Sequence, residues 1–338
     1  MGIKDFYKFL RNKYPECFNF KSYSEFTYKK IAIDMMNLIY IYKARDDKEW
    51  ITNILKFMIK LRKQFIHPIC VFDGVSHPLK EATVKKRREE REKGKLRTEN
   101  LKLELESYKE GKEMGENLKK FVEKKGQDLN ISNISSLEEN IQKTHKNYMI
   151  SFTEEEILIL KKLLEKLGLD VITAENDAEA HCSYLSASDQ VETVLSNDSD
   201  VFFFGCKNVL FKFSEEGGFF IKFEDILKKL EIDKEQFIDI CLLCGTDFNE
   251  SIKGIGFIKS LHLVKKWNRI TNKEIPIYEQ LNHSLLEQVR KFTIYKDVSS
   301  KFSKPINTKN LGDIFFEYGI QIKDIIIPKS QIILENKI

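Results

Sequence analysis

Cysteine and histidine are scarce in this chain, and their scarcity narrows the possible functions. The 338 residues include six cysteines and six histidines. The cysteines are scattered along a chain that is too large to need covalent cross-links, so we expect no disulfide framework. Cys241 and Cys244 form a C-x-x-C pair, but they lie in the apolar run FIDICLLC at helical spacing, with no histidine nearby. We therefore predict buried core cysteines and no zinc site.

Long apolar runs and targeting signals are also missing. No run approaches the roughly 20 residues of a membrane-spanning helix, so we expect no membrane partner. The first ten residues, MGIKDFYKFL, carry charges throughout and predict an amphipathic helix rather than a secretory signal. Gly2 could begin a myristoylation motif, but Phe6 stands where Ser or Thr is required. An intracellular protein is expected, in which the glycosylation sequons are chance matches.

The chain has little excess charge of either sign, and its net charge is +4. Residues 80–97 are the exception, because they hold nine Lys or Arg and four Glu. A concentrated basic stripe is typical of a surface that meets a polyanion. A solvated helix face with ion pairs between successive turns explains the same pattern. On this segment alone the two interpretations remain open.

Short apolar runs rich in β-branched residues predict buried parallel strands. Helical patterns lie between most of them, at residues 50–66 and at residues 153–167. Thr153 and Glu156 form a capping box at the start of the second pattern, and Gly168 follows its end. Alternating strands and helices favour an α/β fold with a doubly wound, mainly parallel sheet. The predicted strands are residues 30–34, 68–73, 169–173, 191–196 and 208–213.

Residues 78–150 interrupt this alternation. They begin with the basic stripe and continue as a highly charged helical stretch to about Lys125. Residues 126–150 are polar and rich in Asn and Ser, which is typical of a loop. We predict an insertion between two strands, with residues 126–150 flexible and outside any core. Long insertions at the ligand-binding end of a sheet often guide substrates.

Seven carboxylates follow apolar runs, and most stand at or just past the end of a predicted strand. In a parallel sheet these ends meet at one edge, where ligands bind. Burying so many like charges together requires cations to neutralise them. Oxygen ligands with almost no histidine nearby select Mg²⁺ or Mn²⁺, and two-metal hydrolysis of phosphodiesters suits them best. The residues are Asp34, Asp73, Asp177, Glu179, Asp198, Asp200 and Asp247.

Taken one at a time, these carboxylates have simpler explanations. Asp73 and Gly74 form a common turn dipeptide, and Asp177 could N-cap the helix that follows it. Asp247 follows Gly245 in a pattern typical of a helix C-cap. Five separate strand or helix ends all carry acids, two of them as D-x-E or D-x-D. This joint pattern favours one shared site.

A second signal lies at residues 245–268. One helix is expected to end near Gly245 and another to begin near Phe257, with Gly254 and Gly256 in the loop between them. Backbone N–H groups exposed beside a helix N-terminus form an anion site. A helix–hairpin–helix element of this type holds a nucleic-acid backbone without reading its sequence. An ordinary helical hairpin is the alternative.

Together and in this order, the motifs resemble those of the flap endonucleases and their relatives, the XPG-type structure-specific 5′ nucleases. The resemblance covers roughly residues 1–270. It rests on MGI, on AID followed by Ile39-Tyr40, on VFDG followed by Lys80 and the KRR run, on DAEA, on D-x-D followed by FFG, and on GTDFNESIKGIG. It implies a PIN-like nuclease core, a helical arch and a helix–two-turn–helix element. It also implies hydrolysis of branched or 5′-ended DNA in replication or repair.

The resemblance implies roles for individual residues. The seven carboxylates would hold two Mg²⁺ or Mn²⁺ ions, and Lys80 and Arg87 would stabilise the phosphate as it is cleaved. Tyr40 would stack on a base beside the scissile phosphate, and Gly2 would pack near the active site. The helix–two-turn–helix would bind duplex DNA, with K⁺ as a further implied ion. The residues implied to contact DNA are Gly2, Tyr40, Arg88, Ser251, Lys253, Gly254, Gly256 and Lys259.

The chain also departs from the family pattern. Asp177 stands where the family usually has Glu, the GIG turn lacks the usual Pro-Lys, and the segment after Tyr40 is short. Gln331 and Leu334 suggest a sliding-clamp motif, but its aromatic pair is absent. These departures argue against clamp binding and against a strict flap preference. A 5′–3′ exonuclease, a junction-resolving or RNA-degrading relative, a silent binding scaffold and a phosphatase remain as alternatives. The seven retained acids disfavour the scaffold.

These interpretations divide the chain into five parts. Residues 1–77 and 151–244 would form the nuclease core, and residues 78–150 the arch with its flexible insertion. Residues 245–300 would bind DNA, and residues 301–338 would form a tail. DNA is the expected partner of a monomer, and RNA remains open. The expected location is the nucleus of a cell or, for a viral protein, the host cell or viral factory.

Overall fold

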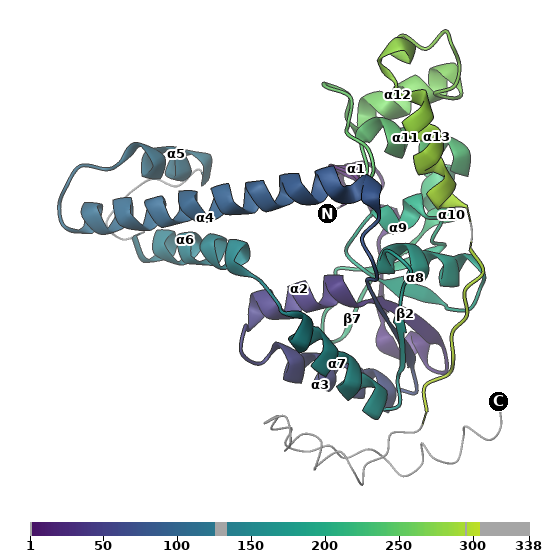
Figure 1. Ribbon diagram of the computed structural model, residues 1–338, viewed down its shortest axis with the longest axis horizontal. Coiled ribbons are helices and arrows are strands. Elements are labelled where there is room, and N and C mark those ends of the chain that lie inside the picture. Colours follow the sequence, from purple (N-terminus) through teal and green to yellow (C-terminus); the bar gives the residue numbers. More distant parts are fainter. Residues whose placement is uncertain (1, 126–133, 295, 305–338) are drawn as a thin grey trace.

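The computed structural model describes residues 2–125, 134–294 and 296–304 (Figure 1). Within these residues seven strands form one sheet in the order β1-β7-β6-β5-β2-β3-β4. The strands are β1 (Asn19–Ser22), β2 (Lys30–Asp34), β3 (His67–Phe72), β4 (Asp170–Thr173), β5 (Thr193–Leu195), β6 (Asn208–Phe211) and β7 (Gly217–Lys222).

The five strands predicted from apolar runs are confirmed, and so is their direction. β2 pairs in parallel with β3 and β5, β3 with β4, and β5 with β6. β7 runs antiparallel to β6 and to β1, and sequence analysis missed both β1 and β7. β1 has an exposed and half-buried pattern, and β7 begins with two glycines, so neither reads as a buried apolar run.

Helices cover both faces of the sheet. Ala32 points to the face packed by α1, α8, α9, α10 and α11, whereas Ile31 and Ile33 point to the face packed by α2, α3 and α7. The fold is therefore doubly wound, as predicted. The bounds are α1 (Phe6–Lys13), α2 (Met35–Arg45), α3 (Trp50–Lys63), α7 (Glu154–Lys166), α8 (Ala178–Ala187), α9 (Asp200–Phe203), α10 (Phe223–Leu230), α11 (Lys234–Cys244), α12 (Phe257–Trp267) and α13 (His283–Arg290), with short 3₁₀ turns at Pro15–Cys17, Tyr23–Phe26, Pro78–Lys80, Tyr278–Gln280 and Lys291–Thr293.

Local signals in the sequence are reproduced closely. Thr153 and Glu156 form the capping box at the start of α7. Gly168 follows the end of α7 with φ +78°, a left-handed conformation that favours glycine. Cys241 and Cys244 are buried, as expected of core cysteines. No helix in the described part of the chain is both long and apolar enough to cross a bilayer.

A helical arm projects from the core, built from α4 (Glu81–Lys109), α5 (Glu116–Lys125) and α6 (Ile134–Met149) (Figure 1). The predicted loop at residues 126–150 is therefore wrong for residues 134–149, and residues 126–133 lie outside the described part. Three helices need only a few apolar side chains to pack together, so the polar composition of α6 concealed its helix. The small core of the arm consists of Leu101, Leu105, Leu118, Val122, Leu137 and Ile141.

Close contacts fix α6 against α4. A Cβ atom at Gly94 would collide with the ring of Tyr148, so glycine lets the two helices approach. One turn further on, Thr98 Oγ1 lies 2.8 Å from His145 Nδ1. The arm is therefore an ordered helical unit and not a loose insertion.

Residues 296–304 run along the edge of the sheet beside β4, and we call them the C-terminal strap. The backbone N–H of Lys304 donates to Gly168 O at 2.6 Å. Ser303 Oγ donates to Pro68 O at 3.2 Å. Residues 301–304 of the expected tail thus belong to this strap, and the rest of the tail, with Gln331 and Leu334, lies outside the described residues.

Candidate active site

Asp34 occupies the carboxyl end of the central strand β2 and is 3% exposed. One carboxylate oxygen accepts a hydrogen bond from Asn37 N at 3.1 Å and so caps α2. The other accepts from Ser196 Oγ at 3.0 Å, across from the end of β5. Both bonds hold the carboxylate in place where β2 and β5 end side by side.

Asp73 follows β3 and links this strand to α8. Its Oδ1 accepts a hydrogen bond of 2.8 Å from the backbone N–H of Ala178, the first residue of α8. Asp177 occupies the N-cap position of α8, but its side chain makes no capping bond. The carboxylate of Asp177 instead lies 2.8 Å from Lys80 Nζ, so helix capping does not explain this residue.

Asp198 and Asp200 follow β5 and are both buried. Asp198 Oδ1 accepts a hydrogen bond of 3.0 Å from Asp200 N, and Asp198 N donates to Ser196 Oγ at 3.1 Å. Asp200 Oδ1 is buried without a hydrogen-bond partner among the described residues. A buried carboxylate oxygen with no donor is unstable unless a cation or water satisfies it.

The amino terminus packs against the same loop. Ile3 N donates to Ser199 Oγ at 2.7 Å. Gly2 has φ +93°, and a Cβ atom there would collide with Asp198 Oδ1 and Ser199 Oγ. Gly2 therefore lies beside the acidic loop, where the resemblance led us to expect it.

Lys80 is a buried cation in the middle of the acids and is 7% exposed. Its Nζ lies 2.8 Å from Asp177, 3.3 Å from Glu179 and 3.6 Å from Asp247. Asp247 follows the end of α11 and also pairs with Arg87 on α4. The first turns of the arm thus hold the acids of α8 and of the segment after α11 together.

One cavity of about 850 Å³ contains these groups. Arg87, Arg88 and Arg91 of α4 line one side of it, and Tyr40 lines another. The Tyr40 ring is packed edge-on against Phe152 at 5.2 Å, and its hydroxyl lies 3.5 Å from Arg91 Nη2. Six of the seven candidate acids line the cavity, namely Asp34, Asp73, Asp177, Glu179, Asp198 and Asp247, while Asp200 lies buried behind Asp198.

Burial makes the charged form of these carboxyl groups unfavourable. Burial, together with the charges of Asp73 and Asp198, raises the pKa of Asp34 to about 7. Burial likewise raises the pKa values of Asp73, Glu179, Asp198 and Asp200 above the ordinary carboxyl range. Burial alone would lower the pKa of Lys80, but Glu179, Asp177 and Asp247 raise it above its ordinary value. The site therefore attracts positive charge strongly.

The donor set fits hard divalent cations. All candidate ligands are carboxylate oxygens, and Asp200 Oδ1 is buried and unsatisfied. In the described residues no three His, Cys, Asp or Glu side chains already surround a single point closely enough to hold a metal. The cationic groups of Lys80 and Arg87 lie among the acids instead and satisfy part of their charge. Metal binding therefore requires Lys80 and Arg87 to break some of their ion pairs with the acids.

The second predicted element lies apart from this cavity. The residues between α11 and α12 form a turn in which Ile255 N donates to Ile252 O at 2.9 Å. Gly254 has φ +76°, and a Cβ atom at Gly254 or Gly256 would meet nothing within 4 Å. Lys259 Nζ donates to Gly254 O at 2.8 Å. The cavity that holds the acids is not lined by Ser251, Lys253, Gly254, Gly256 or Lys259.

Sequence analysis missed the residues that position the acids. Ser196 bridges Asp34 and the backbone of Asp198, and Asn37 Oδ1 accepts from Asn197 N at 3.1 Å. Asn37 is a polar residue inside the apolar run MMNLIY, one turn after Asp34, and that interruption was an available signal. Ser196 carried no such signal, because its function depends on which strand lies next to β5.

Comparison with known proteins shows first which fold class this chain shares and then which family it belongs to. The profile described as the XPG N-terminal domain matches residues 1–94, and the profile described as the XPG I-region matches residues 168–247. The fold is that of the PIN-like nucleases: the catalytic core of Rad2 in complex with DNA superposes with a TM-score of 0.62 at 20% identity, covering 100% of this chain and 99% of that one. Flap endonuclease-1 from Methanococcus jannaschii superposes with a TM-score of 0.58 at 23% identity, covering 88% of each chain.

Relatives in sequence lead to the same family. A protein of Invertebrate iridescent virus 6 named as a probable RAD2-like endonuclease is 29% identical over 303 residues, which cover 80% of this chain and 73% of that protein. Flap endonuclease 1 of Plasmodium chabaudi chabaudi is 27% identical over 303 residues, and the match covers 80% of this chain and 57% of that longer protein. The chain belongs to the XPG-type flap endonuclease family of structure-specific 5′ nucleases.

Proposed function

We propose that this protein is a Mg²⁺-dependent nuclease that hydrolyses phosphodiester bonds in branched or 5′-ended DNA. One observation carries the proposal: six acids line the same cavity as a row of arginines on α4. The acids alone would repel DNA, and the arginines alone would only bind it. Side by side, they suit a phosphate that is first attracted and then cleaved.

The metal ligands proposed are the carboxylates gathered at the ends of β2, β3 and β5 and at the start of α8, together with Asp247. When bound, two Mg²⁺ or Mn²⁺ ions supply an activated water and Lewis-acid stabilisation of the leaving oxygen. Ser196 and Asn37 orient Asp34, and Ala178 N orients Asp73. The ligand set is Asp34, Asp73, Asp177, Glu179, Asp198, Asp200 and Asp247.

Lys80 and Arg87 act on the phosphate. Both cations now pair with acids, and both extend from the first turns of the arm into the cavity. An entering phosphate offers oxygens that compete for the same N–H donors, and charge that develops on it during cleavage strengthens these bonds. When Lys80 and Arg87 turn from the carboxylates to the phosphate, the carboxylates would become free to bind metal. DNA binding and metal binding would thus be coupled.

The arm and the turn before α12 bind different parts of the DNA. Arg87, Arg88 and Arg91 lie along one side of α4, where they can follow successive phosphates of a single strand. Tyr40 offers a ring for stacking. The open backbone at Gly254 and Gly256 suits a duplex phosphate, with K⁺ as a further ion, and Ser251, Lys253 and Lys259 flank this turn.

The wider setting follows from the relatives. They include viral and eukaryotic nucleases, which fits an intracellular role in DNA replication or repair, either in a nucleus or at a site of viral DNA synthesis. We expect a monomer, and the incomplete clamp motif argues against binding of a sliding clamp. Whether RNA is also a substrate is part of the test below.

The proposal is tested with a panel of labelled substrates in Mg²⁺: 5′ flaps, nicks, four-way junctions, single strands and RNA. We expect metal-dependent cleavage near the junction of a 5′ single strand with duplex DNA. Asp200→Asn should reduce that cleavage by at least about a hundredfold while DNA affinity stays within about threefold. Asp189→Asn is the matched control, because Asp189 is exposed, pairs with Lys207 and lines neither cavity. Equal activity of wild type and Asp200→Asn would exclude the metal assignment.

A further inference from the structure

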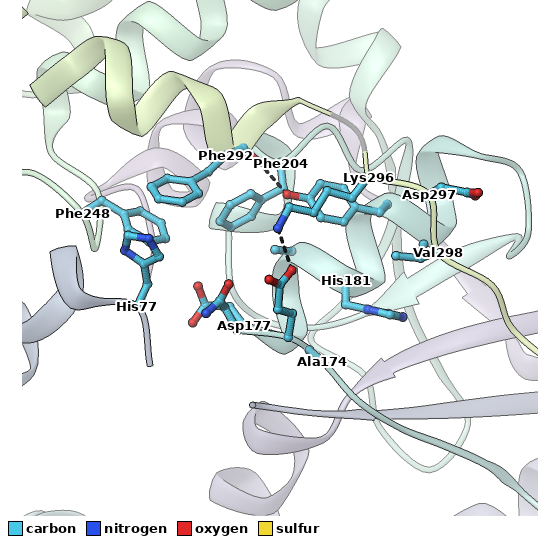
Figure 2. A pocket seen from close by; sticks show the side chains of 14 residues that line it. His77, Ala174, Asp177, His181, Phe204, Phe248, Phe292, Lys296, Asp297 and Val298 are labelled. Carbon is cyan, nitrogen blue, oxygen red and sulfur yellow. Dashed lines mark hydrogen bonds and ion pairs between the residues drawn. The ribbon is translucent and has the colours of Figure 1, made fainter. Parts of the chain in front are cut away.

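A second cavity, with a volume of about 250 Å³, adjoins the active site. It is bounded by α8, by the residues after α9 and α11, and by the segment that follows α13 (Figure 2). Rings gather on one side of it, and His181, Lys296, Asp297 and Val298 on the other. Nothing in the chemistry proposed above uses these residues, apart from Asp177 at its border.

Aromatic side chains form one wall of this cavity. Phe248 and Phe292 are stacked at 4.5 Å between ring centres, and the His77 ring meets Phe292 edge-on at 4.7 Å. Phe204 contacts Phe248 edge-on at 6.3 Å. Tyr184 fixes this wall from behind, because its hydroxyl donates to Phe292 O at 2.7 Å. The wall is a rigid π surface of the kind on which a flat ring stacks.

The other side of the cavity is polar. His181 Nε2 is buried and has no hydrogen-bond partner among the described residues. At the rim, Lys296 Nζ lies 2.7 Å from a carboxylate oxygen of Glu175, and both side chains are largely exposed. A ligand that stacks on the rings and offers a hydrogen-bonding edge to His181 would satisfy both sides at once.

The cavity communicates with the active site. Asn176 and Asp177 line both cavities. Lys80 connects them as well, because its Nζ lies 2.8 Å from Asp177 and 4.8 Å from the centre of the Phe248 ring. A nucleotide whose phosphate lies near Lys80 therefore has its base within reach of the aromatic wall. Tyr40 lines only the larger cavity.

We propose that this cavity binds one unpaired nucleobase of the cleaved strand, from a nucleotide next to the scissile phosphate. The proposal rests on the proposed function, because it places a DNA phosphate at the acids. The volume is below the roughly 300–1,000 Å³ of pockets that take drug-sized ligands, so it suits a single ring system rather than a whole nucleotide. Base capture would open the last base pair and hold the phosphate in position for cleavage.

Ala180→Leu tests the proposal, since Ala180 lies on the cavity wall in α8 and a larger side chain would occupy the space. Single-turnover cleavage is measured on intact strands and on strands with one abasic residue at successive positions around the cut. At one position, loss of the base should slow wild type by at least about fivefold. Ala180→Leu should slow the intact strand by a similar factor, and the two changes together should be no slower than either alone.

Phe292→Leu is the second variant, and it removes the stacking ring while keeping an apolar side chain. Phe20→Leu is the matched control, because Phe20 is an exposed phenylalanine on the edge strand β1 and lines neither cavity. The melting temperature of each variant shows whether it is folded. Wild-type rates on intact DNA for both cavity variants, or effects that multiply with base loss at every position, would overturn the proposal.

A binding measurement separates this proposal from the proposed function. DNA carrying 2-aminopurine beside the cleavage point is titrated without divalent metal, so cleavage plays no part. Stacking on the aromatic wall should quench the fluorescence in wild type and in Phe20→Leu, but not in Ala180→Leu at equal occupancy. Quenching without any cleavage in Mg²⁺ would keep the base site and reject the nuclease. Cleavage with identical fluorescence in all three proteins would keep the nuclease and reject the base site.

Discussion

Lys80 holds together acids that come from two separate parts of the chain. Its ammonium group contacts acids from α8 and from the segment after α11, while its backbone begins the arm. A buried cation and several buried acids stabilise one another only as a set, and removal of one partner leaves the others without compensation. Lys80 therefore neutralises part of the charge of these acids, and under the proposed function it would contact the phosphate once metal ions take over that role.

Replacing Lys80 by Met should slow single-turnover cleavage far more than it weakens DNA binding. We expect a loss of about a hundredfold in rate, comparable to removal of one preorganised donor, and a change in affinity below about threefold. Lys85→Met is the control, since Lys85 is exposed and lines neither cavity. Unchanged rates with weakened binding would make Lys80 part of a general basic surface.

His67 gives the protein a pH dependence outside the active site. Burial, and the charges of Arg62 and Lys30, lower the pKa of His67 from 6.5 to about 4. In this pH window the unfolded chain binds a proton that the folded protein does not, so stability falls as pH falls from about 6.5 towards 4. The neutral ring faces Arg62 Nη1 at 3.0 Å and the Phe302 ring of the strap at 5.1 Å.

His67→Gln should make the melting temperature less sensitive to acid over this window, because Gln keeps an acceptor for Arg62 but does not titrate. Melting temperatures of both proteins are compared between pH 7.5 and pH 4.5. The raised pKa values of the buried acids act in the opposite direction, and their effect cancels in the comparison. Parallel curves for the two proteins would show that His67 is already protonated or accessible to water.

Individual residues were predictable where their position followed from the end of a strand. Asp34 and Asp73 belong to this group, because a parallel sheet brings its carboxyl ends together. The burial of Lys80 was not predictable, since it depends on how the arm leaves the sheet. Asn37 and Ser196 were missed for a similar reason: their hydrogen bonds join elements that are neighbours only in three dimensions.

At the scale of elements, the arm has its own small core, and its stability can be tested separately. Leu105 of α4 is 3% exposed, whereas Leu103 on the same helix is 61% exposed. Leu105→Asp should open the contact between α4 and α6, because it places a charge among apolar side chains. Amide hydrogen exchange in residues 100–109 and 134–149 should speed up by at least about tenfold, with the sheet unchanged.

Leu103→Asp is the matched control for this prediction. It makes the same substitution two residues away, on the exposed side of α4, and should leave exchange in the arm as in wild type. Faster exchange throughout the sheet in Leu105→Asp would mean that the arm and the sheet unfold together. Sequence analysis missed α6 because its apolar residues Ile134, Leu137 and Ile141 are few, although their spacing is helical. A short polar helix is recognised only with its partner helices in place.

At the scale of the whole molecule, the cavity and the turn before α12 are separate surfaces, and the proposed function assigns them to two forms of DNA. The arm lies over the acids, and the turn lies beyond α11. Asp247 joins them, because it follows α11 and ends in the cavity. A substrate with both a duplex and a 5′ single strand can occupy the two surfaces at once, and this favours such DNA over either form alone.

Replacing both Gly254 and Gly256 by Leu should weaken binding of substrates that have a double-stranded arm. Side chains there would block the open backbone, so fewer phosphates would be neutralised, and the plot of log Kd against log salt should become shallower. Single strands should bind as before. The measurement is Kd against salt for a flap and for a single strand. Equal losses on both would assign the turn to the stability of the fold.

Gly2 has a practical consequence for producing the protein. Its Cα packs against Asp198 and Ser199, at a place where even a methyl group would collide with them. An affinity tag joined ahead of Gly2 would therefore start beside these acids, in the region that the proposed function assigns to the incoming strand. A preparation that keeps such a tag could seem inactive although its acids are intact. Removal of such a tag before an assay keeps this region open to the substrate.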